Sequence, residues 1–145
     1  MLKCWGRNFY GQLGTGNLIG SVVPTDVAGL GGGIVAVAAG GEHTCALNHS
    51  GGVQCWGLND RGQLGDGTNT NRSVPTNVSG LGGPAIAIAA GYKHTCALLT
   101  DGRVQCWGAN NRGQLGIASL THQANPRTVM FYSTRLPFVG INMAE

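Results

Sequence analysis

The chain has 145 residues, which is enough for one domain with a modest core. Its formal net charge is +3, and the few Lys and Arg residues are scattered along the sequence. This composition argues against nucleic-acid binding, which needs a clustered basic stripe, and no apolar run is long enough to cross a bilayer. Residues 1–6 hold no hydrophobic signal region, and the abundant glycines between short Val-, Ile- and Ala-rich runs favour an all-β chain.

One block of residues returns at a fixed interval along the chain. Cys-Trp-Gly at 4–6 recurs at 55–57 and at 106–108, which sets a period of 51 residues. A period of this size is typical of an array of supersecondary units, none of which can bury its apolar faces alone. The features that keep the interval are Gly-Gln-Leu-Gly at 11–14, 62–65 and 113–116, Pro24, Pro75 and Pro126, and His-Thr-Cys-Ala-Leu at 43–47 and 94–98.

Each unit is predicted to contain about four strands. In the second unit these are 74–79, 85–90, 94–99 and 104–108. The segment 85–90 alternates large and small apolar residues, as does 34–39 in the first unit. Because both faces are apolar, these two segments are expected to be buried on both sides as the innermost strands of propeller blades.

The two strands that follow the innermost strand are predicted to form a hairpin. Thr100-Asp101-Gly102 fits a type I turn closed by a G1 bulge, which pairs Leu99 with Arg103. This register places Cys96 opposite Cys106, and the matching turn in the first unit places Cys45 opposite Cys55. We expect either cross-strand disulfides or adjacent buried thiols at these two places.

The fifth cysteine, Cys4, is expected to be unpaired. Its partner would lie ten residues earlier, as Cys45 does before Cys55, and that position precedes Met1. Disulfides would indicate an extracellular or cell-envelope protein, whereas free thiols would indicate a cytoplasmic one.

The repeated block resembles the RCC1 (regulator of chromosome condensation) repeat, in the cysteine-containing form of RCC1-like and alpha-tubulin-suppressor-like repeats. The resemblance rests on Cys-Trp-Gly-x-Asn-x-x-Gly-Gln-Leu-Gly, Pro-x-x-Val and Ala-Ala-Gly-x-x-His-Thr-Cys-Ala-Leu, and it covers residues 4–129. It implies a ring of about seven blades. This chain would supply a partial β-propeller of about two and a half four-stranded blades.

The sequence divides into a repeat array at 1–129 and a non-repeat tail at 130–145. The array consists of units at about 4–54 and 55–105 and a partial unit at 106–129. Phe131, Tyr132 and Phe138 give the tail apolar surface with which to cap the last unit.

The residues that recur in every unit are interpreted as structural, because a catalytic residue is needed once per site. They are the tryptophans Trp5, Trp56 and Trp107, the glutamines Gln12, Gln63 and Gln114, and the histidines His43 and His94. The cysteines lack the Cys-x-x-Cys spacing of zinc sites, and no nucleophile–base set stands out. We therefore predict no catalytic residues, no bound cofactor and no metal.

The predicted function is that of a protein-interaction module whose partner meets loops at one rim of the propeller. The alternative, implied by the family's founding member, is guanine-nucleotide exchange on a small GTPase by the complete propeller. A photoreceptor role, known in one branch of the family, would need a tryptophan cluster, and residues 41–42 and 92–93 supply none. We expect a protein partner, no nucleic acid, no membrane insertion, and self-association through open propeller edges.

Overall fold

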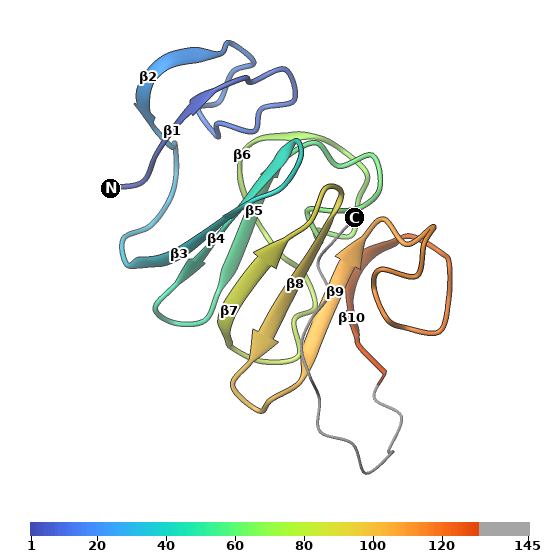
Figure 1. The fold of residues 1–145 in the computed structure, drawn as a ribbon. Helices are drawn as coiled ribbons and strands as arrows, with labels where there is room; N and C mark the ends of the chain where they lie inside the picture. The colour runs from blue at the N-terminus through green and yellow to red at the C-terminus, as the bar shows by residue number, and fades with distance from the viewer. Residues whose placement is uncertain (131–145) are drawn as a thin grey trace.

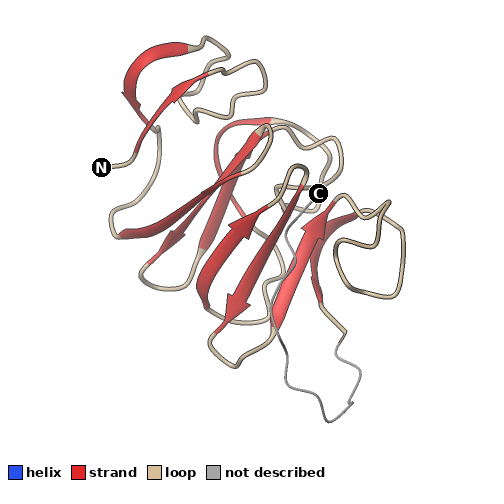
Figure 2. Ribbon diagram, in the orientation of Figure 1, coloured by secondary structure: helices blue, strands red, loops and turns tan. Residues whose placement is uncertain are grey.

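The computed structural model describes residues 1–130, and this part of the chain contains strands and no helix (Figures 1 and 2). The strands are β1 (Lys3–Gly6), β2 (Ser21–Asp26), β3 (Ile34–Ala39), β4 (His43–Asn48), β5 (Val53–Gly57), β6 (Arg72–Asn77), β7 (Ala85–Ala90), β8 (His94–Leu99), β9 (Val104–Gly108) and β10 (Gln123–Thr128).

The strands form three antiparallel sheets that follow one another along the chain. β1 and β2 pair as a two-stranded sheet, β3 to β6 form the first four-stranded sheet, and β7 to β10 form the second. The two larger sheets lie side by side, and the small sheet lies beyond the first of them (Figure 1). The all-β prediction and the partial propeller are confirmed.

The grouping of strands within a unit was wrong at one point. The segment predicted at 74–79 was assigned to the same unit as 85–90, but β6 pairs with β5 and closes the preceding sheet. β6 returns antiparallel beside β5, and a Gly-rich link then leads to β7 in the next sheet. The position of β6 as an outer edge explains Pro75, because a residue without an N–H group is tolerated on an edge strand.

The hairpin register agrees with the sequence prediction. Cys45 lies opposite Cys55 and Cys96 lies opposite Cys106 on neighbouring strands. In the second hairpin, Gly102 donates its N–H to the carbonyl of Leu99 at 3.0 Å and has a φ of +90°, a conformation that suits glycine. Both cysteine pairs form disulfides, with Cα atoms 4.1 Å apart in each.

The innermost strands are not buried on both faces as predicted. Val35 and Ile86 are 61% and 58% exposed because each lies at a bulge, where the register with the next strand shifts by one residue. Val37 lies beyond the bulge, opposite Ala46, on the face of the sheet turned toward β1 and β2. It is 45% exposed because, within residues 1–130, that small sheet consists of β1 and β2 alone and leaves Val37 uncovered.

An apolar groove of about 690 Å³ follows this uncovered face. Self-association through such open edges stays a prediction. The residues that line the groove are Met1, Leu2, Val27, Leu30 and residues 31–37.

The core is shared between sheets rather than enclosed within one. Leu47 and Val53 of the first four-stranded sheet pack with Leu99 and Trp107 of the second, and Leu64 completes the cluster. A second cluster joins Val27, which follows β2, to Ala46 and Trp56 of the first large sheet. No sheet in the described part of the chain buries its faces alone.

The Gly-Gln-Leu-Gly loop of each sheet lies directly against the tryptophan of the next sheet. Gly65 has a φ of +68°, and a Cβ at this position would lie 2.6 Å from the Trp107 indole nitrogen. Gly14 meets Trp56 in the same way. Trp56 and Trp107 are therefore fully buried, whereas Trp5, which no such loop precedes in this chain, is 62% exposed.

The predicted tail, with its capping role for Phe131 and the residues that follow, lies outside the described residues.

Alkylation of the native chain followed by non-reducing mass spectrometry should recover linked peptides for Cys45–Cys55 and Cys96–Cys106. Cys4 alone should be alkylated, and slowly, because burial raises the pKa of its thiol. A reduced and unfolded sample, in which all five cysteines react, is the control. Rapid alkylation of four or more cysteines in the native chain would contradict the disulfide pairing.

Candidate functional site

Three loops of the same construction follow β1, β5 and β9. We call these the rim loops, and we call the end of the molecule that they form the rim. Each is organised by a buried asparagine, which is Asn8, Asn59 or Asn110. In the middle loop the Asn59 amide nitrogen donates to the carbonyls of Thr68 and Thr70 at 2.9 and 3.0 Å. Its amide oxygen accepts the N–H of Leu64 at 3.0 Å. Because one side chain ties three points of the loop together, the backbone of the rim is held in a defined shape.

The same contacts recur in the other two loops. Asn8 donates to the carbonyls of Asn17 and Ile19 and accepts from Leu13. Asn110 donates to the carbonyls of Ser119 and Thr121 and accepts from Leu115. The rim is therefore a repeated backbone scaffold.

The repeated glutamines brace the turn at the tip of each loop. The side-chain oxygens of Gln12, Gln63 and Gln114 accept the N–H groups of Tyr10, Arg61 and Arg112 at 2.8–2.9 Å. The backbone of Gln12 also reaches the next sheet. Its carbonyl accepts hydrogen bonds from the Thr44 hydroxyl and the Trp56 indole, both at 2.9 Å.

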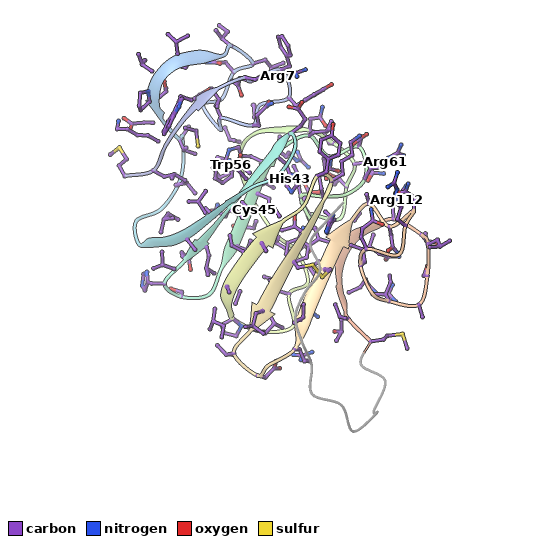
Figure 3. The ribbon with its side chains drawn as sticks, in the orientation of Figure 1. Arg7, His43, Cys45, Trp56, Arg61 and Arg112 are labelled. Atoms are coloured by element: carbon purple, nitrogen blue, oxygen red, sulfur yellow. A yellow bond between two sulfur atoms is a disulfide. The ribbon has the colours of Figure 1, made fainter. Side chains whose placement is uncertain are left out.

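His43 lies on β4 and takes part in the interface with the next sheet (Figure 3). Thr95 donates its hydroxyl proton to the Gln63 carbonyl at 2.9 Å, so it accepts from Nε2 of His43, also at 2.9 Å. His43 is 1% exposed. Burial, followed by the nearby charge of His94, lowers the pKa of His43 to about 4, so the imidazole is neutral at pH 7.

His94 occupies the equivalent place on β8, also buried, on the strand face that carries Cys96. Cys45 lies at the interface between sheets, with its sulfur 3.9 Å from the Thr95 hydroxyl. Cys4 lies on β1 opposite Thr25 and is partly buried. These positions place His43 and Cys45 in the packing between the two four-stranded sheets, and they leave His94 buried within the second sheet.

At each of two interfaces, a charged residue of a rim loop pairs with a residue of opposite charge on the next sheet. The loop supplies the base at the first interface and the acid at the second. At the first interface, Arg7 pairs with Glu42 at 3.3 Å. At the second, Asp60 pairs with Lys93 at 2.8 Å. Glu42 and Lys93 occupy equivalent positions one period apart. Partial burial alone would raise the pKa of Asp60, but hydrogen bonds from Lys93 and Gln63 outweigh it and hold that pKa below its ordinary value.

A polar hollow of about 310 Å³ opens on the rim between the two four-stranded sheets. Arg61 and Arg112, from neighbouring rim loops, lie at the same end of the molecule (Figure 3). Lys93 also lines the hollow, so three cations that are far apart in the sequence meet there. The full lining is Arg61, Tyr92, Lys93, Ala109, Asn111, Arg112, Gln114 and His122.

The sequence interpretation described the cations as scattered and did not identify this hollow. Arg61 and Arg112 are one period apart, so aligning the repeats by position would have placed them in equivalent loops. Lys93 comes from the turn before β8, and only the packing of neighbouring sheets brings it to the same place.

Among residues 1–130, no group of three or more His, Cys, Asp or Glu side chains could hold a metal ion. The same residues include no helix long and apolar enough to span a membrane.

Successive antiparallel sheets, joined by loop-to-tryptophan contacts and carrying matching rim loops, define a β-propeller assembled from sequence repeats. The chain belongs to the RCC1 repeat family. The family model described as the regulator of chromosome condensation (RCC1) repeat matches residues 4–47, 50–98 and 101–143. The last match continues past residue 129, where the sequence interpretation ended the resemblance.

Curated relatives are much longer than this chain. Human E3 ubiquitin-protein ligase HERC2 is 40% identical over 127 residues, which cover 86% of this chain and 3% of HERC2. The ultraviolet-B receptor UVR8 of Arabidopsis thaliana is 38% identical over 127 residues, which cover 86% of this chain and 29% of UVR8.

Solved structures show the same fold. Yeast RCC1 (Prp20), in its complex with Kap60, superposes with a TM-score of 0.80 at 21% identity, over 91% of this chain and 33% of that one. Human WBSCR16 superposes with a TM-score of 0.76 at 28% identity, over 88% of this chain and 34% of that one.

The stability of the chain should fall as the pH is lowered from 7 to 5. The unfolded state takes up a proton near pH 6.5, whereas the native state holds His43 neutral down to about pH 4. Stability is therefore lost between these two values, by about 2 kcal/mol from this group at pH 5. Urea unfolding at both pH values measures the loss.

His43→Gln should flatten the pH dependence, because glutamine does not titrate. His49→Gln, at an exposed histidine in the first hairpin turn, is the matched control for removing an imidazole. Equal stability at pH 5 and pH 7, or an unchanged slope in His43→Gln, would contradict the assignment.

Proposed function

We propose that the chain is a protein-interaction module that binds its partner through the rim loops following β1, β5 and β9. The observation that carries this proposal is the contrast between a constant scaffold and variable tips. Equivalent tip positions carry Phe9, Asp60 and Asn111, and the next positions carry Tyr10, Arg61 and Arg112. A binding surface needs such local differences on a rigid support, whereas a purely structural rim does not.

The exposed rim side chains are of the kinds that dominate protein interfaces. Phe9 is 66% exposed and Tyr92 is 59% exposed, although both are aromatic. Arg61 and Tyr92 both line the polar hollow. Aromatic residues and arginine are enriched among the residues that contribute most to binding energy.

A non-catalytic role is part of the proposal. The buried polar side chains of the described residues mostly recur at the repeat period, and their hydrogen bonds connect loops and sheets. Asn8, Asn59 and Asn110 make the same contacts in each loop, for example. A catalytic centre would need a set of polar groups that occurs once.

The solved relatives support partner binding as the proposed role. Yeast RCC1 is seen bound to Kap60, and a second structure is described with its binding properties to Gsp1p and histones. Nucleotide exchange on a small GTPase has less support here. The likeness to yeast RCC1 at 21–22% identity supports the fold, and this chain spans about a third of that protein.

The test is recovery of a partner from an extract of the source organism, with the chain as bait and two double variants for comparison. Phe9→Ser/Tyr92→Ser removes exposed aromatic surface from the rim. Val22→Ser/Val74→Ser removes exposed apolar surface from the outer strands β2 and β6. A rim-bound partner should be retained by the wild type and the outer-strand variant, and its affinity should fall at least about tenfold in the rim variant.

Retention of the same partners by the rim variant would contradict the proposal. Loss of the partners from both variants alike would show that capture depends on exposed apolar surface in general.

A further inference from the structure

We infer that the chain binds a second copy of itself head to tail, with the loop at residues 113–118 of one copy seated on the β1–β2 sheet of the next. This inference concerns assembly and does not depend on the partner proposed for the rim. It rests on the two interfaces between sheets inside the chain, which repeat one set of contacts. It also rests on two surfaces that carry the halves of a third such interface.

Each internal interface joins a rim loop to the outer strand of the following sheet. The Gly16 N–H donates to the Ser73 carbonyl on β6 at 2.9 Å, and the Gly67 N–H donates to the Ala124 carbonyl on β10 at 3.0 Å. The Gly-Gln-Leu-Gly segment of the same loop lies against the tryptophan of that sheet. The two interfaces therefore follow one pattern, displaced by one period of the sequence.

The third rim loop has the same construction, but it faces no sheet within residues 1–130. Gly14 and Gly65 are buried against the next sheet, whereas the equivalent Gly116 is exposed. Among the described residues, a Cβ at Gly116 would meet only Val129, which follows β10 of the same sheet. The place that a tryptophan takes at the other two loops is therefore open to a neighbouring molecule.

Ala118 shows that this loop keeps the conformation that binds an outer strand. It occupies the position of Gly16 and Gly67 in the earlier repeats. Its φ is +56°, in the left-handed region like the +84° and +81° of those glycines, although a side chain disfavours this conformation. Its N–H makes no backbone hydrogen bond within residues 1–130. The loop therefore presents a donor to a strand outside the described chain.

The β1–β2 sheet carries the other half of the interface. Trp5 is 62% exposed, although the tryptophans of the other two sheets are fully buried. On β2, Val22 is 98% exposed at the position where Ser73 accepts from the preceding loop. A Cβ at Gly6 would meet no described atom within 4 Å, whereas one at the equivalent Gly57 would lie 3.2 Å from the backbone of the preceding loop.

The two surfaces lie at opposite ends of the row of sheets, so a second copy can bring them together (Figure 1). In the pair, Gly116 of one copy lies against Trp5 of the other, and the Ala118 N–H donates to the Val22 carbonyl. Burial of the large exposed indole favours this association. Because different surfaces of the two copies meet, each pair still has one loop and one tryptophan with which to bind further copies.

Sedimentation velocity of the full chain at increasing concentration tests the inference. The wild type should form dimers and larger species. Trp5→Ala removes the indole, and Gly116→Asn fills the space that the indole would take, with a residue that tolerates the φ of +64°. Each variant should weaken self-association at least about tenfold.

Each variant has a matched control. Ile86→Ser removes apolar surface that is 58% exposed, on β7 of the second large sheet. Gly102→Asn places the same residue as Gly116→Asn at a φ of +90°, in a hairpin turn where a Cβ meets no described atom within 4 Å. Both controls should change self-association less than about twofold, because neither lies on the two surfaces.

An equimolar mixture of the two variants tests the head-to-tail geometry. Trp5→Ala keeps an intact loop and Gly116→Asn keeps an intact tryptophan, so one sound interface can form between them. The mixture should form a dimer with about the affinity of the wild type, and this dimer should not grow, because its outer ends are both altered.

A wild type that stays monomeric at every concentration would overturn the inference and would show that another segment of the same chain occupies the loop. Self-association of both variants at wild-type strength would assign the contact to a different surface, such as the open edge of β1. A mixture that stays monomeric, while urea unfolding shows both variants to be folded, would exclude the head-to-tail arrangement.

Discussion

A four-stranded sheet of short strands exposes two apolar faces and cannot cover either of them by itself. In this chain neighbouring sheets cover each other where they meet, through the contact between a Gly-Gln-Leu-Gly loop and the tryptophan of the following sheet. Gly65 lies so close to Trp107 that a side chain would collide with the indole. The Gln12 carbonyl accepts from Trp56 and Thr44 at the equivalent place in the preceding interface. The other features of the structure depend on this contact, because it fixes the spacing of the sheets and hence of their rim loops.

The repeated polar residues hold the rim in place, and the variable residues are free to differ. Asn59 ties the loop together from inside, where it is fully buried, while Arg61 projects from the same loop only two residues later. Glu42 and Lys93 occupy equivalent positions in two repeats and carry opposite charges. The charge of the surface therefore differs between repeats, while the structure of the loops stays the same. We therefore attribute stability to the repeated positions and recognition to the positions between them.

Much of this structure could be predicted from the sequence because its signals are local. The turn at Asp101-Gly102 determines a register, and that register places Cys96 opposite Cys106. Other features depend on strand pairing and register, which short-range sequence patterns do not encode. β6 could have paired with the strand before it or the strand after it, and the bulges at Val35 and Ile86 expose residues that an alternating pattern would bury. The polar hollow combines Arg61, Lys93 and Arg112, which only the packing of neighbouring sheets brings together.

The division between scaffold and rim is the central claim, and it is tested most directly by comparing Asn59→Ala with Arg61→Ala in urea unfolding at pH 7. Asn59→Ala should lower the free energy of unfolding by about 2 kcal/mol or more with an unchanged denaturant slope, because it leaves buried backbone groups of the loop without partners. Arg61→Ala should change it by less than about 0.5 kcal/mol. An Arg61 substitution as destabilising as that of Asn59, or an Asn59 substitution without effect, would contradict the account.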